Sequence, residues 1–387
     1  MKTGPRVAHL IDPDFGGEAA LWAAAAAQRV PGFQHRAWLI GGQAARHAAR
    51  AAGLAIDREA CAPLGLGELA ARSVKRWMAE PGPRPDLLIA WSEAAMGLAG
   101  FAAPETSAIG VVCSSPQRTW RGVGAGWLQR HALARTPIIC CGAGLIDSWA
   151  AIGAAAHREI PLPGRAPGRD DRDAVRAALG LERDEVAVLL LADPPDIGEP
   201  KRFAHLMGIM EVTGHPAVGL VGDAVGGWPR AARFVRRFGT DWPFIRFQGA
   251  WVDALAAADL VVWQTRAQPM VADAPRRGGA ALAMAALAAG VPVVAVDEPF
   301  TRATMAGLAA APELLADGQV DHRLASVLRG WVADADRRSA FAAVARAFAA
   351  AQQAAFERAF ATAVHECADV AAKVAADAAR WPAPAAV

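Results

Sequence analysis

A pair of adjacent glycines marks the place in this sequence best suited to hold an anion. Gly278 and Gly279 precede an alanine-rich run that predicts a helix, and Gly290 and Pro292 end that run before an expected strand over Val291–Val296. The first N–H groups of a helix have no partner inside it, and the positive end of the helix dipole lies beside them. Small residues let an anionic group approach those N–H groups closely. The segment therefore predicts a phosphate-type anion site.

Two cations and a second glycine pair fit the same chemistry. Arg277 directly precedes the first pair, and Lys201 lies near an expected helix start, where its ammonium suits a phosphate oxygen as a point charge. A solvated lysine in a first helical turn is the alternative. Gly16 and Gly17 lie between an expected strand and helix, where glycine lets a ligand approach the backbone. An ordinary tight turn explains that pair equally well.

Composition bounds the classes of protein that this chain could represent. Its 387 residues are 54% hydrophobic, with 40 basic and 38 acidic residues and a net charge of +2. The length allows two domains, the hydrophobic content excludes a disordered chain, and the charge balance argues against binding of duplex nucleic acid. Tyrosine and asparagine are absent, and arginine far outnumbers lysine. Because this bias follows GC-rich codons, we expect a bacterial source.

The cysteines and the apolar runs indicate no metal site, disulfide framework or membrane span. There are five cysteines and no Cys-x-x-Cys pair. Cys140 and Cys141 end an apolar run, and His9 lies within an expected strand, so we interpret all three as buried core residues. The first residues lack the apolar core of a secretory signal, and the longest uncharged run is broken at Gly290. We therefore expect a cytoplasmic protein.

Short β-branched runs alternate with helical stretches along most of the chain. This alternation predicts an α/β fold of parallel sheets, in two Rossmann-like, doubly wound domains. A linker rich in Pro, Gly and charge around residues 161–172 separates expected domains at residues 1–163 and 173–335, and a helical tail over residues 336–387 is expected to pack on them. The expected strands are Val7–Ile11, Ala37–Ile40, Asp86–Ala90, Ile109–Val112, Pro137–Cys141, Val186–Leu191, Ala217–Val221, Phe244–Phe247, Asp259–Trp263 and Val291–Val296.

Four motifs in a fixed order narrow this generic fold. They are the glycine turn after the first strand, a strand running into Trp91-Ser92, the Phe247-Gln-Gly249 turn before Ala258-Asp259-Leu-Val-Val-Trp263, and the final Ala289-Gly290-Val-Pro-Val-Val294. In order and spacing the chain resembles the family 4-like group of GT-B glycosyltransferases, over about residues 7–365. The resemblance implies two Rossmann-like domains facing a cleft. It also implies hexosyltransferase-type transfer of a sugar from a nucleotide-diphosphate sugar to an acceptor, retaining and metal-independent, with the donor as substrate and no cofactor.

The resemblance also assigns expected roles to individual residues. The expected contacts to the donor diphosphate are Gly16, Gly17, Lys201, Arg277, Gly278 and Gly279. Beside these, Ser115, Gln117, Thr265 and Asp273 are candidate contacts to the sugar or acceptor; Ser115 and Gln117 could donate hydrogen bonds, and Asp273 could substitute for a missing family carboxylate. The family's two carboxylates, seven residues apart, correspond here to Arg277 and Ala285, and its histidine near the reacting sugar is missing. A catalytically degenerate binding or scaffold protein of the same fold is therefore the alternative function.

The acceptor is unidentified from sequence. A saccharide or a lipid-linked acceptor is expected, because some relatives act on lipid-linked acceptors at the inner face of the membrane. Residues 117–130 mix arginines with Trp120 and Trp127, a mixture that suits an anionic membrane surface, although we favour a surface loop with aromatic packing. A nicotinamide dehydrogenase is disfavoured because the first loop lacks the Gly-x-Gly-x-x-Gly spacing.

Overall fold

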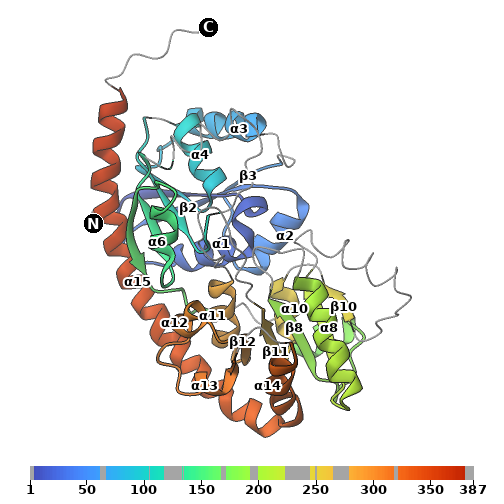
Figure 1. Ribbon diagram of the computed structural model, residues 1–387. Helices are drawn as coiled ribbons and strands as arrows, with labels where there is room; N and C mark the ends of the chain where they lie inside the picture. Colours follow the sequence, from blue (N-terminus) through green and yellow to red (C-terminus); the bar gives the residue numbers. More distant parts are fainter. Residues whose placement is uncertain are drawn as a thin grey trace. The chain divides into compact units, whose positions relative to one another are not determined.

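The chain forms two compact units, each built around one parallel sheet (Figure 1). Unit 1 comprises Met1–Arg46, Leu54–Ile160 and Glu357–Val387, and unit 2 comprises His47–Gly53 and Pro161–Phe356. The computed structural model describes residues 4–61, 67–103, 105–116, 133, 135–166, 171–191, 199–222, 245–248, 251–264, 279–317 and 321–379.

Unit 1 contains a seven-stranded sheet in the order β3-β2-β1-β4-β5-β6-β7. Its strand pairs are parallel. The chain runs outward from β1 to β3 on one side and from β4 to β7 on the other, so the order reverses between β1 and β4. The strands are β1 (Arg6–Ile11), β2 (Gln34–Ile40), β3 (Arg58–Ala60), β4 (Leu87–Ala90), β5 (Ala108–Val112), β6 (Ile138–Cys141) and β7 (Ala156–Ile160).

The core of unit 1 is buried on both faces of the sheet. Strands β4 and β6 read LLIA and IICC and are buried throughout, the pattern of a parallel sheet covered on both sides by helices. Trp22, Trp38, Trp91 and Trp149 are among the largest side chains in this core. The helices between the strands are α1 (Pro13–Ala27), α2 (Gln43–Ala51), α3 (Gly67–Ala79), α4 (Glu93–Ala102) and α6 (Leu145–Ala150).

Unit 2 repeats this plan with a six-stranded sheet in the order β10-β9-β8-β11-β12-β13, reversing between β8 and β11. The strands are β8 (Ala187–Leu191), β9 (Val218–Gly222), β10 (Ile245–Gln248), β11 (Leu260–Trp263), β12 (Val293–Val296) and β13 (Leu315–Ala316). The helices are α7 (Arg172–Ala178), α8 (Glu199–Val212), α10 (Trp251–Ala257), α11 (Ala280–Ala289), α12 (Pro299–Thr304), α13 (Ala311–Leu314) and α14 (Asp321–Ala333).

Helix α15 (Ala335–Ala379) contributes residues to both units. In unit 2, Phe341 meets Trp331 edge-on at 5.4 Å between ring centroids. In unit 1, Phe360 stacks on Trp91 at 6.2 Å and His365 stacks on Phe33 at 5.1 Å. The apolar stripe of this helix therefore packs against aromatic residues of each unit.

The fold class predicted from sequence is confirmed, and each of the ten expected strands is present within three residues of its expected bounds. Three further strands were missed: β3, β7 and β13. Strands β3 and β7 read REA and AHREI, and all three lie at the edge of a sheet. Charged residues in β3 and β7, and the two-residue length of β13, leave these edge strands without the apolar runs that mark central strands.

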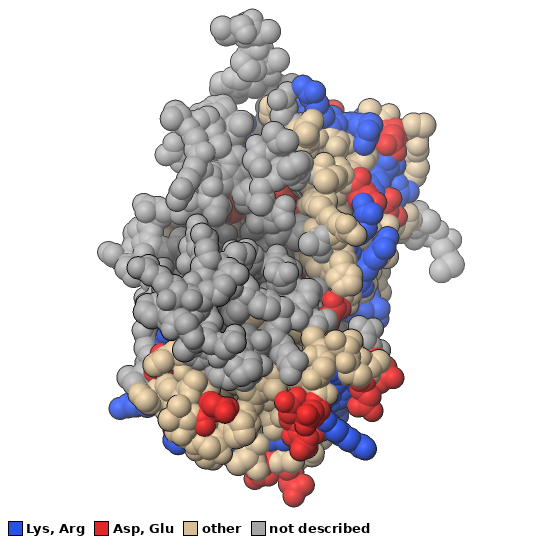
Figure 2. Space-filling model, turned by 90° about the vertical axis from the view of Figure 1, so that its right-hand side faces the viewer, with Lys and Arg blue, Asp and Glu red and all other residues tan. Residues whose placement is uncertain are grey.

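Two other expectations concern membrane spans and the distribution of surface charge. Within the described part of the chain, no helix is both long enough and apolar enough to cross a membrane. On the described part of the face in Figure 2, Lys and Arg side chains lie interspersed with Asp and Glu. That mixture agrees with the balanced composition of the whole chain.

Candidate functional site

The carboxyl ends of β8 and β11 form the centre of the candidate site in unit 2. In open α/β sheets, ligands bind outside the carboxyl ends of the strands where the strand order reverses. Here the reversal lies between β8 and β11, and the register pairs Trp263, the last residue of β11, with Leu191, the last residue of β8. The chain returns to this edge at Gly279, the residue from which α11 starts.

Gly279 is held in a position that only glycine fits. Its φ of 78° and ψ of −10° lie in the left-handed region. A Cβ atom there would come within 2.4 Å of Leu191 Cδ2 and 2.9 Å of Trp263 Nε1. Other L-residues pay a steric penalty at positive φ, and the neighbouring side chains leave no room for a methyl group. The glycine therefore brings the start of α11 directly against the ends of β8 and β11.

Among the described residues, the start of α11 has no side-chain cap, as is also true of α6 and α13, whereas α4 and α7 have one. Ser92 caps α4 by accepting a hydrogen bond from the Ala95 N–H at 3.0 Å. No side chain caps α11 in the described part of the chain, although Gly279 and Ala280 are buried. The first N–H groups of a helix have no partner inside it, so this helix end is suited to an anion.

Helix α11 itself is an uncharged, buried element. Ala280–Ala288 are buried, and Gly290, with a φ of 84°, ends the helix as its left-handed cap. Ala285, where the resembled family carries its second carboxylate, has no exposed surface. A methyl group makes no hydrogen bond, so Ala285 cannot do the work of that carboxylate.

Gln264, which directly follows β11, was missed in the sequence analysis, where the next residue, Thr265, was chosen. Its side chain has no exposed surface, and neither its amide oxygen nor its amide nitrogen has a hydrogen-bond partner among the described residues. The sequence did contain a signal for Gln264, because its polar amide directly follows the apolar strand LVVW.

Polar side chains also gather at the carboxyl edge of the sheet in unit 1. Asp12 follows β1, and Ser92 and Glu93 follow β4; all three are buried, as is Glu18 in α1. Because β1 and β4 pair Leu10 with Ala90, continuing that register by two residues places Asp12 opposite Ser92. These carboxylates lie at the reversal point of the sheet in unit 1, where a polar ligand is expected.

His9 is a core residue, as predicted from sequence. The Trp91 indole N–H donates to His9 Nδ1 at 3.0 Å, His9 Nε2 lies 2.9 Å from His35 Nδ1, and His35 Nε2 lies 2.9 Å from the Val30 carbonyl oxygen. Burial, reinforced by His35, holds the pKa of His9 well below its ordinary value. Both ring nitrogens of His9 are occupied, so it is not available as a general base.

Several residues chosen from sequence lie in described elements. Gly16 and Gly17 lie in the first turns of α1, and Lys201 is the third residue of α8. Ser115 is buried after β5, and Gly279 precedes α11. Gln117, Thr265, Asp273, Arg277 and Gly278 lie outside the described residues.

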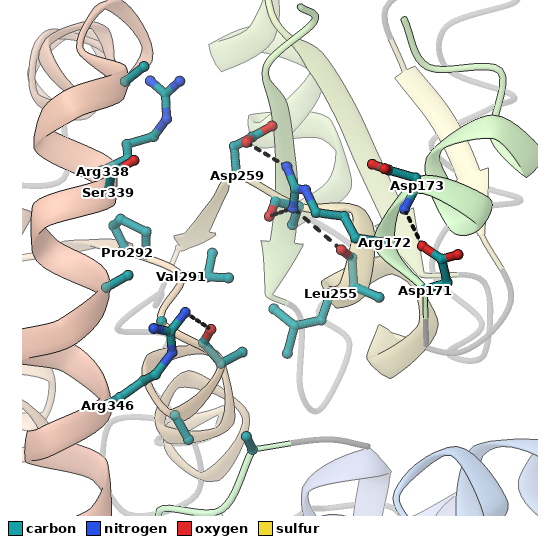
Figure 3. Close-up of a pocket in the computed structure, with 18 residues that line it drawn as sticks. Asp171, Arg172, Asp173, Leu255, Asp259, Val291, Pro292, Arg338, Ser339 and Arg346 are labelled. Atoms are coloured by element: carbon teal, nitrogen blue, oxygen red, sulfur yellow. Dashed lines mark hydrogen bonds and ion pairs between the residues drawn. The ribbon is translucent and has the colours of Figure 1, made fainter. Parts of the chain in front are cut away.

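A hollow of about 1490 Å³ lies at the opposite edge of the sheet in unit 2 (Figure 3). Asp259 precedes β11 and Pro292 precedes β12, so both mark the amino ends of their strands. Arg172 on one side of the hollow is paired with Asp259 at 2.7 Å, and Arg346 of α15 lies at the carboxyl end of α11, near the Ala289 carbonyl oxygen. The hollow is therefore separate from the carboxyl-edge site.

No family model matches this sequence, and no curated protein does. Solved structures do match most of the chain. The Anabaena protein Alr3699/HepE in complex with UDP and glucose has a TM-score of 0.61 at 16% identity, covering 93% of this chain and 99% of its own. Sucrose-phosphate synthase (tll1590) from Thermosynechococcus elongatus has a TM-score of 0.57 at 15% identity, covering 96% and 98%.

The fold is GT-B. A UDP-N-acetylglucosamine 2-epimerase also matches, with a TM-score of 0.50 at 10% identity, covering 88% of this chain and 91% of its own. A protein named as a synthase and one named as an epimerase thus share the fold of this chain. Its activity must therefore be argued from the residues at the two carboxyl edges.

Proposed function

We propose that this chain binds a nucleotide-diphosphate sugar at the carboxyl edge of the sheet in unit 2 and transfers the sugar to an acceptor. The observation that carries the proposal is the uncapped start of α11 at Gly279, which suits a diphosphate. Structures of Alr3699/HepE, which match this chain with TM-scores of 0.57 and 0.58, are described as complexes with UDP and with UDP-glucose. A uridine diphosphate sugar is therefore the first donor to test.

The protein's part in the reaction is to stabilise the departing diphosphate. As the bond between sugar and diphosphate breaks, negative charge grows on the leaving phosphate oxygens. Fixed N–H donors and cations aimed at that charge lower the barrier because they need no reorganisation during the reaction. The backbone N–H groups at the start of α11, with Lys201 and Arg277, would supply this stabilisation. On the resemblance, we further propose a metal-independent reaction with retained stereochemistry.

The acceptor would bind at the carboxyl edge of the sheet in unit 1. Asp12 and Glu93 are carboxylates at the point where strand order reverses, and Ser115 follows the neighbouring β5. Carboxylate oxygens accept hydrogen bonds from sugar hydroxyl groups. These groups support a saccharide acceptor, free or linked to a lipid. We place the reaction in the cytoplasm, with contact at the membrane surface if the acceptor is lipid-linked.

Binding without turnover is the second candidate function, and the environment of Ala285 favours it. A buried methyl group replaces a carboxylate at that position, so the ribose contact implied by the resemblance is missing. The backbone anion site does not depend on that carboxylate. A protein that keeps the diphosphate site and has lost catalysis would still bind UDP.

Binding and turnover assays with a panel of nucleotide sugars distinguish sugar transfer from binding without turnover. We expect UDP and at least one UDP-sugar to raise the melting temperature of the purified protein, and donor to be consumed slowly by transfer or hydrolysis. Binding with no consumption of any donor would favour the degenerate protein. Conversion of one UDP-sugar to its epimer would indicate an epimerase, and absence of binding across uridine and guanosine nucleotides would exclude the proposal.

A further inference from the structure

Gln264 carries an unsatisfied amide inside unit 2. Its side chain is fully buried, and neither Oε1 nor Nε2 has a hydrogen-bond partner among the residues that the structure describes. A buried polar atom without a partner costs about 1–3 kcal/mol. Satisfied glutamine amides occur elsewhere in the chain: the Gln28 amide donates to the Ala55 carbonyl oxygen at 3.0 Å and accepts from the Ala55 N–H at 2.9 Å.

The position of Gln264 ties it to the candidate donor site. It is the next residue after Trp263, whose indole nitrogen lies beside the position that a Cβ of Gly279 would occupy. Trp263 therefore points toward the face of the sheet that α11 covers. Side chains alternate along a strand, so Gln264 extends from the same strand end toward the other face.

That other face carries the start of α8. The chain moves from β8 to β9 in one direction and from β11 to β12 in the other, and right-handed crossovers then place α8 and α11 on opposite faces of the sheet. Lys201 lies in the first turn of α8. Gln264 thus lies, buried, at the carboxyl edge of the sheet between the starts of two helices, and a helix start favours negative charge.

We infer that the Gln264 amide hydrogen-bonds a hydroxyl group of the nucleotide sugar, on one of the two sugar rings that flank its diphosphate. The inference rests on the proposed function. A hydroxyl group both donates and accepts, so it can pair with either atom of an amide, and ribose and the transferred sugar both carry such groups. The amide would supply a sugar contact that Ala285 cannot make.

The test uses the full chain with two apolar replacements of similar volume, Gln264→Leu and Gln264→Met. Removing both unsatisfied amide atoms should leave the melting temperature of the free protein unchanged or raise it. The same variants should weaken UDP-glucose binding about tenfold or more. A matching loss for UDP would assign the contact to ribose, and a loss confined to UDP-glucose would assign it to the transferred sugar.

Gln28→Leu is the matched control, because it removes an amide whose partners are known. It should lower the melting temperature and leave both affinities unchanged. If the Gln264 variants instead melt at a lower temperature and bind UDP and UDP-glucose as tightly as wild type, the amide is satisfied by internal water and the inference is wrong. If wild type itself binds neither compound, the proposed function fails together with the inference.

Discussion

The indole N–H of Trp91 donates to Nδ1 of His9 at 3.0 Å, and this one bond fixes the direction of a chain of hydrogen bonds through the core of unit 1. Because His9 Nδ1 accepts, a neutral His9 carries its proton on Nε2 and donates to His35 Nδ1 at 2.9 Å. His35 then carries its proton on Nε2 and donates to the Val30 carbonyl oxygen. Both histidines must be neutral for the chain to persist.

The stability of the protein should therefore fall as the pH drops below about 6.5. Burial, as the largest cause, lowers the pKa of His9 and of His35, so the unfolded chain binds protons that the folded chain excludes. The stabilisation is complete above the unfolded pKa of about 6.5. Below it, the fully buried His9 removes up to about 1.4 kcal/mol per pH unit until its folded pKa is reached, and the partly exposed His35 removes less.

Urea unfolding between pH 7.5 and 5.5 checks this prediction. His35→Gln should reduce the slope, because it removes one of the two histidines whose pKa is lowered in the folded protein. His157→Gln should leave it unchanged, because His157 is exposed on β7. A free energy of unfolding that stays constant across this window in wild type would contradict the proposed protonation states.

Gly279→Ala should destabilise the protein and weaken UDP binding. The substitution forces an L-residue to a φ of 78° and places a methyl group 2.4 Å from Leu191 Cδ2, so the helix start must move. Gly214→Ala is the matched control, since its φ is 73° and no atom lies within 4 Å of the added Cβ. We expect Gly279→Ala to cost about 1–3 kcal/mol more than the control in a denaturant titration. Equal costs would show that the helix start is not tightly packed.

Phe360→Ala should remove much of the stability of unit 1. Phe360 has no exposed surface and stacks on Trp91, and deleting a buried phenyl ring costs about 3–5 kcal/mol. Val370→Ala on the same helix should cost less than about 0.5 kcal/mol, because Val370 is 38% exposed. Chemical denaturation of both variants measures the difference. A loss below about 1 kcal/mol for Phe360→Ala would mean that α15 is only loosely attached.

Native protein should take up one equivalent of an alkylating reagent at pH 8. Cys61 is the exposed member of the five free cysteines. Burial raises the pKa of the Cys140 thiol to about 12 and that of Cys367 to about 11, so the reactive thiolate is scarce at both. Intact-mass measurement should show one adduct in wild type and none in Cys61→Ser, with five in denatured wild type. A second adduct in the native protein would show that a core cysteine is accessible.

The central strands could be predicted from sequence, because strands buried on both faces consist of apolar runs such as LLIA and IICC. The edge strand β7 could not be predicted, because its sequence AHREI mixes polar and apolar residues as many exposed loops do. The start of α11 was predicted correctly at Gly279, since a glycine before an alanine-rich run is a local signal.

The site was harder to predict, because its chemistry depends on long-range pairing. Asp12 and Ser92 lie 80 residues apart and come together only through the register of β1 and β4. Gln264 looks like an ordinary loop residue until its burial and its lack of partners are known. A single sequence carries neither the register nor the burial, so these residues could not be chosen in advance.

The most direct test of diphosphate binding at the start of α11 is calorimetric titration of the wild-type protein with UDP and with uridine. If the N–H groups beyond Gly279 hold the diphosphate, UDP should bind and uridine should bind about 100-fold more weakly or not at all, a difference of about 2.7 kcal/mol. Equal affinity for UDP and uridine would contradict a diphosphate site, and binding of neither compound would contradict the proposed function as a whole.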